Sequence, residues 1–132
     1  MRPEKMRGEQ QANAQRSPLI GRVAIVTGGG RGLGRAMVLG LAQAGVYVVA
    51  TASRESAELE VVAREAQQTC GEARVIPHMA NVTREEDCSQ VVETALSKFG
   101  RLDILVNNAG RGMKYISNAF SDRAASILGS RA

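Results

Sequence analysis

Aromatic side chains are scarce in this sequence, and their scarcity bears on any role in binding nucleic acid. The 132 residues include two tyrosines, two phenylalanines and no tryptophan. Proteins that bind single strands stack the bases on aromatic side chains along a basic groove. The excess of Lys and Arg, which gives a net charge of +4, lies at the two ends of the chain rather than in its middle. We therefore expect no nucleic-acid partner.

Side chains that bind metals are equally few. The two cysteines, Cys70 and Cys88, form no Cys-x-x-Cys pattern, and His78 is the one histidine. A structural zinc site needs four such ligands, so we expect no metal. Both thiols are expected to pack on helices in a reducing compartment, and a nucleophilic thiol is the alternative.

Long apolar runs are also missing from the sequence. No stretch approaches the roughly 18 apolar residues that a membrane span requires. The first 20 residues lack the apolar core of a secretory signal. We expect no membrane partner and a cytoplasmic location.

The chain does contain short apolar runs that alternate with stretches of helical period, from Leu19 to Gly110. This alternation is typical of a parallel sheet covered by helices. Residues 1–18 are polar and are expected to form a disordered leader, and residues 111–132 an irregular tail. The expected strands are 22–27, 46–51, 73–76 and 102–106. The expected helices are 33–44, one from an N-cap at Ser53 to Gly71, and one from a capping box at 83–86 to Gly100.

Each expected helix has an apolar stripe that should face the sheet. The stripes are Leu33, Met37, Leu41 and Ala44; Leu59, Val62, Ala63, Ala66 and Cys70; and Cys88, Val91, Val92, Ala95 and Phe99. Three right-handed crossovers give four strands in the order 3-2-1-4 if the first strand is central. The expected fold class is α/β, a truncated Rossmann-type doubly wound parallel sheet in residues 19–110.

A glycine-rich turn joins the first expected strand to the first helix, with the sequence Thr27-Gly28-Gly29-Gly30-Arg31-Gly32-Leu33-Gly34. Backbone N–H groups at a helix start can approach a pyrophosphate closely where no Cβ intervenes, and the helix dipole favours the negative charge. This context favours phosphate binding over a simple tight turn. The phosphate loop of nucleotide hydrolases needs Lys and a hydroxyl where Arg35 and Ala36 stand, so kinase and ATPase chemistry is set aside.

The pattern Thr-Gly-x3-Gly-x-Gly, with Asn107-Asn108-Ala109-Gly110 after the fourth strand, resembles the short-chain dehydrogenase/reductase family. The resemblance covers about residues 19–118, whereas family members normally run to twice this length. It implies that the turn beneath a nicotinamide cofactor is formed by Gly28, Gly32 and Gly34, braced by Thr27, with the N–H of Leu33 directed at the pyrophosphate. It also implies that Asn108, Ala109 and Gly110 line the adenosine side, and that Asn107 ties the fourth strand to its neighbour.

Two further places bear on the cofactor that this resemblance implies. Asn81-Val82 stands where the family has Asp-Val, whose carboxylate accepts a hydrogen bond from adenine; the Asn81 amide oxygen can still accept one, with weaker binding. An acid directly after the second strand would repel a 2′-phosphate. In this sequence Ser53 and Arg54 stand there instead of an acid. Arg54 and Arg31 can bind that phosphate, as in NADP-preferring members, or remain solvated surface arginines. We expect Ser53 and Arg54 in the site, and NADP rather than NAD.

The family's catalytic Tyr-x-x-x-Lys pair is missing, because Thr51 follows Tyr47 by four positions and Ala119 follows Tyr115. The resemblance therefore implies an N-terminal fragment of an NADP-dependent oxidoreductase, with no catalytic residue in this chain. The small-molecule substrate would be a carbonyl, an alcohol or an activated double bond. The alternatives are a non-catalytic nucleotide-binding or regulatory module and a nonfunctional truncated product.

Two expectations concern the later part of the chain. Ile104, Leu105 and Val106 would lie on an unpaired apolar edge prone to aggregation, and the family's homo-oligomer contacts would be missing. Residues from about Phe120 onward are expected to derive from a shifted reading frame, because the resemblance ends abruptly after Ser117.

Overall fold

A computed structural model describes residues 17–110. In chain order the elements are β1 (Val23–Thr27), α2 (Gly32–Gln43), β2 (Tyr47–Ala52), α3 (Ser56–Cys70), β3 (Val75–Met79), α4 (Glu85–Phe99) and β4 (Ile104–Val106). The described part begins within the expected leader, since the carbonyl of Ser17 accepts the N–H of Ile20 in a turn. The rest of the leader, the irregular tail and the proposed change of reading frame lie outside the described residues.

The four strands form one parallel sheet in the order β3-β2-β1-β4, which confirms the predicted topology. Strand β1 is central, and all five of its residues are buried. Its run of Val23, Ala24, Ile25 and Val26 is buried because helices cover both faces of a parallel sheet.

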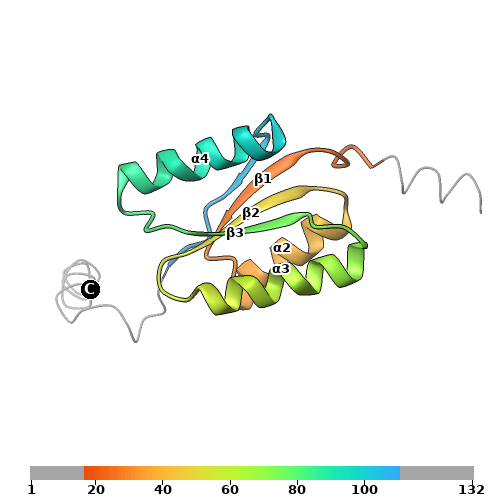
Figure 1. The fold of residues 1–132 in the computed structure, drawn as a ribbon, viewed down its shortest axis with the longest axis horizontal. Coiled ribbons are helices and arrows are strands. Elements are labelled where there is room, and N and C mark those ends of the chain that lie inside the picture. The colour runs from red at the N-terminus through yellow and green to blue at the C-terminus, as the bar shows by residue number, and fades with distance from the viewer. Residues whose placement is uncertain (1–16, 111–132) are drawn as a thin grey trace, which may run out of the picture.

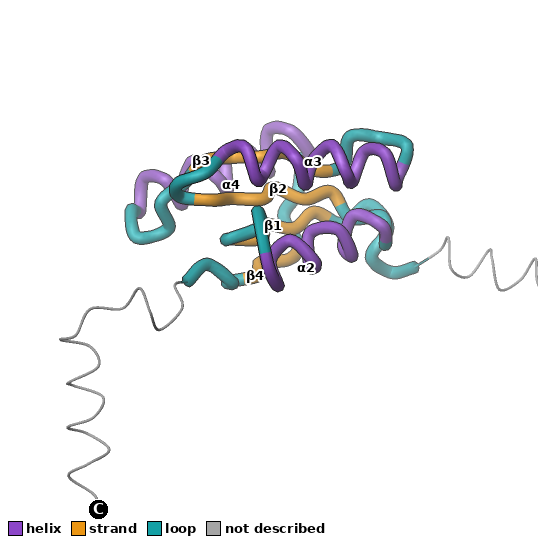
Figure 2. The backbone as a smooth tube through the Cα atoms, turned by 90° about the horizontal axis from the view of Figure 1, so that it is seen from below, coloured by secondary structure: helices purple, strands orange, loops and turns teal. Residues whose placement is uncertain are grey.

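The helices lie on opposite faces of this sheet, with α2 and α3 on one side and α4 on the other (Figure 1; Figure 2 gives the perpendicular view). Ala24 and Val26 pack in the cluster under α2 and α3, whereas Val23 and Ile25 pack against α4. The chain thus crosses from one face to the other between β3 and β4. The carboxyl ends of β1 and β4 therefore mark the topological switch point, where doubly wound sheets bind ligands.

The buried face of α2 differs from the predicted stripe. Its buried residues are Gly34, Val38 and Ala42, whereas Leu33 is 70% exposed. The helix lies so close to the turn after β1 that small residues face the sheet, and a pattern based on large apolar residues overlooks them.

Both predicted N-caps are wrong. Helix α3 has Glu55 at its N-cap rather than Ser53, and α4 has Arg84 there, without a side-chain cap hydrogen bond in either case. The expected capping box fails because the Thr83 hydroxyl donates to Oδ1 of Asn81 instead of capping the helix. Asp87 in the first turn of α4 accepts the backbone N–H of Asn81 at 2.7 Å and fixes the entry of the chain.

The outer edges of the sheet also differ from expectation. Strand β3 runs to Met79 and so includes Pro77, which is tolerated because β3 is an edge strand.

On α4, Val91 and Ala95 are buried as predicted, but Cys88 and Val92 are exposed. The predicted stripes of α3 hold, with Leu59, Val62 and Ala66 buried.

Candidate functional site

The turn between β1 and α2 brings the backbone of the two elements into very close contact. A Cβ on Gly34 would overlap the carbonyl oxygen of Gly28 and lie 2.5 Å from Nδ2 of Asn108. Gly28 has a φ of +66°, and a Cβ there would lie 3.0 Å from Cα of Ala109. Both positions therefore require glycine, one for close approach and the other also for its backbone conformation.

The buried hydroxyl of Thr27 holds the ends of β1 and β4 together. Its Oγ1 accepts the backbone N–H groups of Asn108 and Ala109 at 3.0 and 2.9 Å and donates to the carbonyl of Val106 at 3.3 Å. Because a hydroxyl has one proton and two lone pairs, these three bonds use its full capacity. The family resemblance implied that Thr27 braces the glycine turn, and the bonds that the structure shows join it to the end of β4.

Asn108 adds the second connection between these ends, through its side chain. Its Nδ2 donates to the carbonyl of Gly28 at 3.1 Å. Asn107 was expected to tie the fourth strand to its neighbour, but it is exposed and makes no side-chain hydrogen bond within residues 17–110. Asn108 and Thr27 perform that structural role instead.

The start of α2 offers backbone donors without a built-in acceptor. Arg31 occupies the N-cap with extended backbone and no side-chain cap, and the first turn contains no acidic residue. The first turns of α3 and α4, in contrast, carry Glu58 and three acids respectively. The first N–H groups of a helix lack intrahelical partners and lie at the positive end of its dipole, so this turn can accept an anion. Gly32 and Leu33, which begin α2, are exposed.

Two exposed arginines lie at this end of the sheet, Arg31 in the turn itself and Arg54 after β2. Ser53 and Arg54 follow β2 and are both exposed. Arg31 is also exposed, but its Nε lies 3.8 Å from Oε2 of Glu58 in α3. Sequence inspection missed Glu58 because nothing in its local pattern indicates that the first turn of α3 packs beside the glycine turn.

Asn81 and Val82 follow β3 at the same end of the sheet. Oδ1 of Asn81 accepts the N–H and the hydroxyl of Thr83, at 3.0 and 2.5 Å. The amide oxygen expected to receive the adenine amino group is therefore already engaged within the loop, while Val82 is 40% exposed.

Tyr47, one of the two tyrosines, is a packing residue. Its ring lies 5.0 Å from that of Phe99, centroid to centroid, and packs against the α4 side of the core. The other tyrosine, Tyr115, lies outside the described residues.

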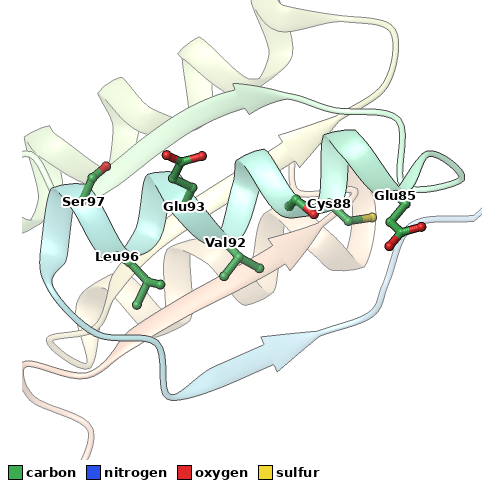
Figure 3. A pocket seen from close by; sticks show the side chains of 7 residues that line it. Glu85, Cys88, Val92, Glu93, Leu96 and Ser97 are labelled. Carbon is green, nitrogen blue, oxygen red and sulfur yellow. The ribbon is translucent and has the colours of Figure 1, made fainter.

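The outer face of α4 carries an open groove that does not touch the glycine turn (Figure 3). Val92 and Leu96 contribute its apolar surface and are 40% and 48% exposed. Cys88 lines it too, whereas Cys70 is half-buried against the core.

In the described part of the chain, no cluster of three His, Cys, Asp or Glu is placed to hold a metal ion, and no helix there is long and apolar enough to cross a membrane.

Comparison with known proteins places this geometry in a family. The short chain dehydrogenase model matches residues 22–126, which extends beyond residue 118, where the resemblance was expected to end. The short-chain dehydrogenase/reductase FrzI of Cladobotryum sp. is 36% identical over 113 residues, a match that covers 83% of this chain and 43% of that protein.

Two solved structures share the fold and were determined with different cofactors. The 3-ketoacyl-(acyl-carrier-protein) reductase from Brucella melitensis, complexed with NADH, superposes with a TM-score of 0.64 and is 36% identical, over 83% of this chain and 45% of that one. A metagenomic short-chain oxidoreductase in complex with NADP gives a TM-score of 0.65 and 32% identity, over 78% of this chain and 48% of that one.

The chain spans less than half the length of each of these three proteins. The family model nevertheless covers all seven elements that the structure describes. The chain belongs to the short chain dehydrogenase family.

Proposed function

We propose that this chain carries the NADP-binding half of an oxidoreductase. The observation that supports it best is the turn at the start of α2, where Gly34 and Gly28 have no room for a Cβ and the backbone N–H groups have no built-in acceptor. The turn is held against β4 by Thr27 and Asn108. A dinucleotide pyrophosphate fits such a turn because backbone donors and the helix dipole both favour it.

The residues present fit a nicotinamide dinucleotide in the following roles. The N–H groups of Gly32 and Leu33 hold the pyrophosphate, and Ala109 and Gly110 line the adenosine side. Arg31 and Arg54 bind the 2′-phosphate of NADP, which has no counterpart in NAD. When bound, the cofactor supplies hydride transfer to or from a carbonyl, an alcohol or an activated double bond.

NADP is preferred over NAD in this proposal because the residues that follow β2 are exposed Ser53 and Arg54 rather than an acid. Each charge-assisted hydrogen bond to a phosphate contributes about 1.5–3 kcal/mol, less where the arginine is exposed. The related structures were solved with NADH and with NADP, so the family as a whole uses both.

We propose further that the 132-residue chain alone does not turn over substrate. Neither tyrosine is followed four positions later by lysine, so the chain has no Tyr-Lys pair to exchange a proton with a substrate oxygen. That same feature favours a second candidate function, a nucleotide-binding module without chemistry.

A cytoplasmic location completes the proposal, since the exposed thiol of Cys88 suits a reducing compartment.

A titration of NADP and NAD into the full chain tests the binding. We expect Gly34→Ala to abolish binding of both cofactors, because its Cβ would overlap the turn. Gly40→Ala is the matched control: it lies in the same helix with no atom within 4 Å of the added Cβ, and it should bind normally. We expect Arg54→Ala to weaken NADP about tenfold, or about 1.4 kcal/mol, and to leave NAD unchanged.

Equal affinity of the unmodified chain for both cofactors would contradict the NADP preference, and binding to neither would contradict the function itself. A panel of carbonyl substrates with NADPH tests the proposal that the chain alone does not turn over substrate. Turnover above background would overturn that proposal and would also exclude the module without chemistry.

A further inference from the structure

Glu58 in the first turn of α3 lies against the glycine turn, although it is 24 or more positions from it in the sequence. A Cβ on Gly30 would lie 3.1 Å from Cβ of Glu58 and 3.3 Å from its Oε2. The same oxygen is 3.8 Å from Nε of Arg31. A carboxylate thus occupies the side of the turn on which one of the two phosphate-binding arginines lies.

The pair between Glu58 and Arg31 is loose. At 3.8 Å it is a charge contact, and the structure gives it no hydrogen bond. The Arg31 side chain is 81% exposed, so water screens the attraction and the guanidinium keeps its freedom. Glu58 therefore does little to orient Arg31, and its main effect is to reduce the positive potential at the turn.

A 2′-phosphate bound by Arg31 would lie near this carboxylate, because Oε2 of Glu58 is 3.8 Å from Nε of Arg31. Two like charges a few ångströms apart repel each other, and a phosphate monoester carries up to two negative charges. NAD carries a hydroxyl at that position and is not opposed in this way.

We infer that Glu58 is a specificity-determining residue that restrains the affinity for NADP and leaves that for NAD unaffected. This inference rests on the proposed cofactor-binding function. It assigns to one carboxylate of α3 a role that the glycine motif and the two arginines do not reveal. The chain then combines two arginines that favour the 2′-phosphate with one acid that opposes it, so its preference for NADP is smaller than the arginines alone would give.

Glu58 also has a structural role, since an acid in the first turn stabilises a helix by its favourable interaction with the positive end of the helix dipole. That role alone would make Glu58→Gln lower the melting temperature slightly and would leave the ratio of the two cofactor affinities unchanged. The ratio is therefore the readout that separates specificity from stability.

The test is a titration of NADP and NAD into the full chain and into two variants, Glu58→Gln and the control Glu60→Gln, at low and high salt. Glu60 is exposed on the same helix and contacts neither the turn nor Arg31 in the described residues. We expect E58Q to bind NADP about three to five times more tightly, as removal of one exposed charge contact allows. The affinity for NAD should change less than twofold, and E60Q should behave as the unmodified chain.

The gain of E58Q should shrink between about 20 mM and about 500 mM NaCl, because salt screens exposed charges. A second variant, Glu58→Lys, should raise the affinity for NADP beyond that of E58Q. An equal change for both cofactors, or weaker NADP binding by E58Q, would overturn the inference while leaving the proposed function intact. Failure of the unmodified chain to bind either cofactor would refute the proposed function, and the inference with it.

Discussion

At the scale of single residues, two threonines with opposite hydrogen bonding make the clearest comparison. Thr27 and Thr51 are adjacent partners in the register of β1 and β2, and both are buried. The hydroxyl of Thr27 makes three hydrogen bonds. The hydroxyl of Thr51 has no partner in the described structure. The Thr27 hydroxyl therefore stabilises the fold, whereas the burial of the Thr51 hydroxyl without a hydrogen bond destabilises it.

We expect Thr27→Val to lower the free energy of unfolding by about 1–3 kcal/mol, because it removes three hydrogen bonds and leaves the N–H of Ala109 without its partner. The N–H of Asn108 still donates to the carbonyl of Val106 at 3.1 Å, which limits the loss. Thr51→Val should be neutral or should stabilise the fold by up to about 1 kcal/mol, since it removes a hydroxyl whose loss of hydration on burial is not compensated by a hydrogen bond. Urea denaturation of both variants measures these differences. Similar destabilisation by the two substitutions would show that volume, not hydrogen bonding, decides the outcome.

At the scale of elements, the sequence predicted the sheet better than the helix surfaces. The apolar run of β1 and the alternation of strands and helices sufficed for the order 3-2-1-4. The phase of α2 could not be read in this way, because its contact with the sheet is made by Gly34 and Ala42, whose small size comes from close packing against a turn formed elsewhere in the chain.

The candidate site divides along the same line. The glycine turn, Thr27 and Asn108 could be found from a local motif, and the structure brings them together. The contact of Glu58 with Arg31, and the use of the Asn81 oxygen by Thr83, depend on how separate elements meet. No local pattern carries that information.

A second element-scale feature joins the starts of β1 and β4, at the opposite end of the sheet from the glycine turn. Asp103 accepts the backbone N–H of Val23 at 2.9 Å and hydrogen bonds from Arg101 and Arg22. The hydrogen bonds from Arg101 and from the Val23 backbone lower the pKa of Asp103 to about 2, from an ordinary value of 3.8.

This lowered pKa predicts a defined loss of stability in acid. Because the folded state holds Asp103 ionised more strongly than the unfolded state does, its contribution is complete above about pH 4 and disappears as the pH falls toward 2. We expect Asp103→Asn to be less stable than the unmodified chain at pH 7 and to lose less stability between pH 5 and pH 2. Urea midpoints at a series of pH values measure this, and parallel curves for the two proteins would contradict it.

At the scale of the whole molecule, the described part of the chain leaves β4 with one hydrogen-bonded neighbour, β1. Leu105 on that strand is 60% exposed, and Val92 and Leu96 expose apolar surface on the outer face of α4. Exposed apolar strand edges are templates for association between chains. We propose that the 132-residue chain associates through this edge rather than through the family's own oligomer contacts.

We expect the chain to elute from size exclusion above its 14.0 kDa monomer mass, and Leu105→Lys to shift it toward the monomer. Val61→Lys is the control, because Val61 is 50% exposed on α3, on the other face of the sheet. It should leave the elution unchanged. A compact monomer of the unmodified chain that unfolds cooperatively would refute this prediction.

The bonds of Thr27 and Asn108 also determine when the glycine turn can take its final form. Their partners are 80 to 82 positions apart, so nearly the whole described chain must be synthesised before they can meet. Contacts of such long range form late in folding, since the intervening chain must first be ordered. A nascent chain therefore acquires its first strand and helix early but completes the glycine turn only when β4 docks. If the turn holds a nucleotide as proposed, the docking of that last strand also completes the binding site, and a bound nucleotide would in turn hold β4 in place.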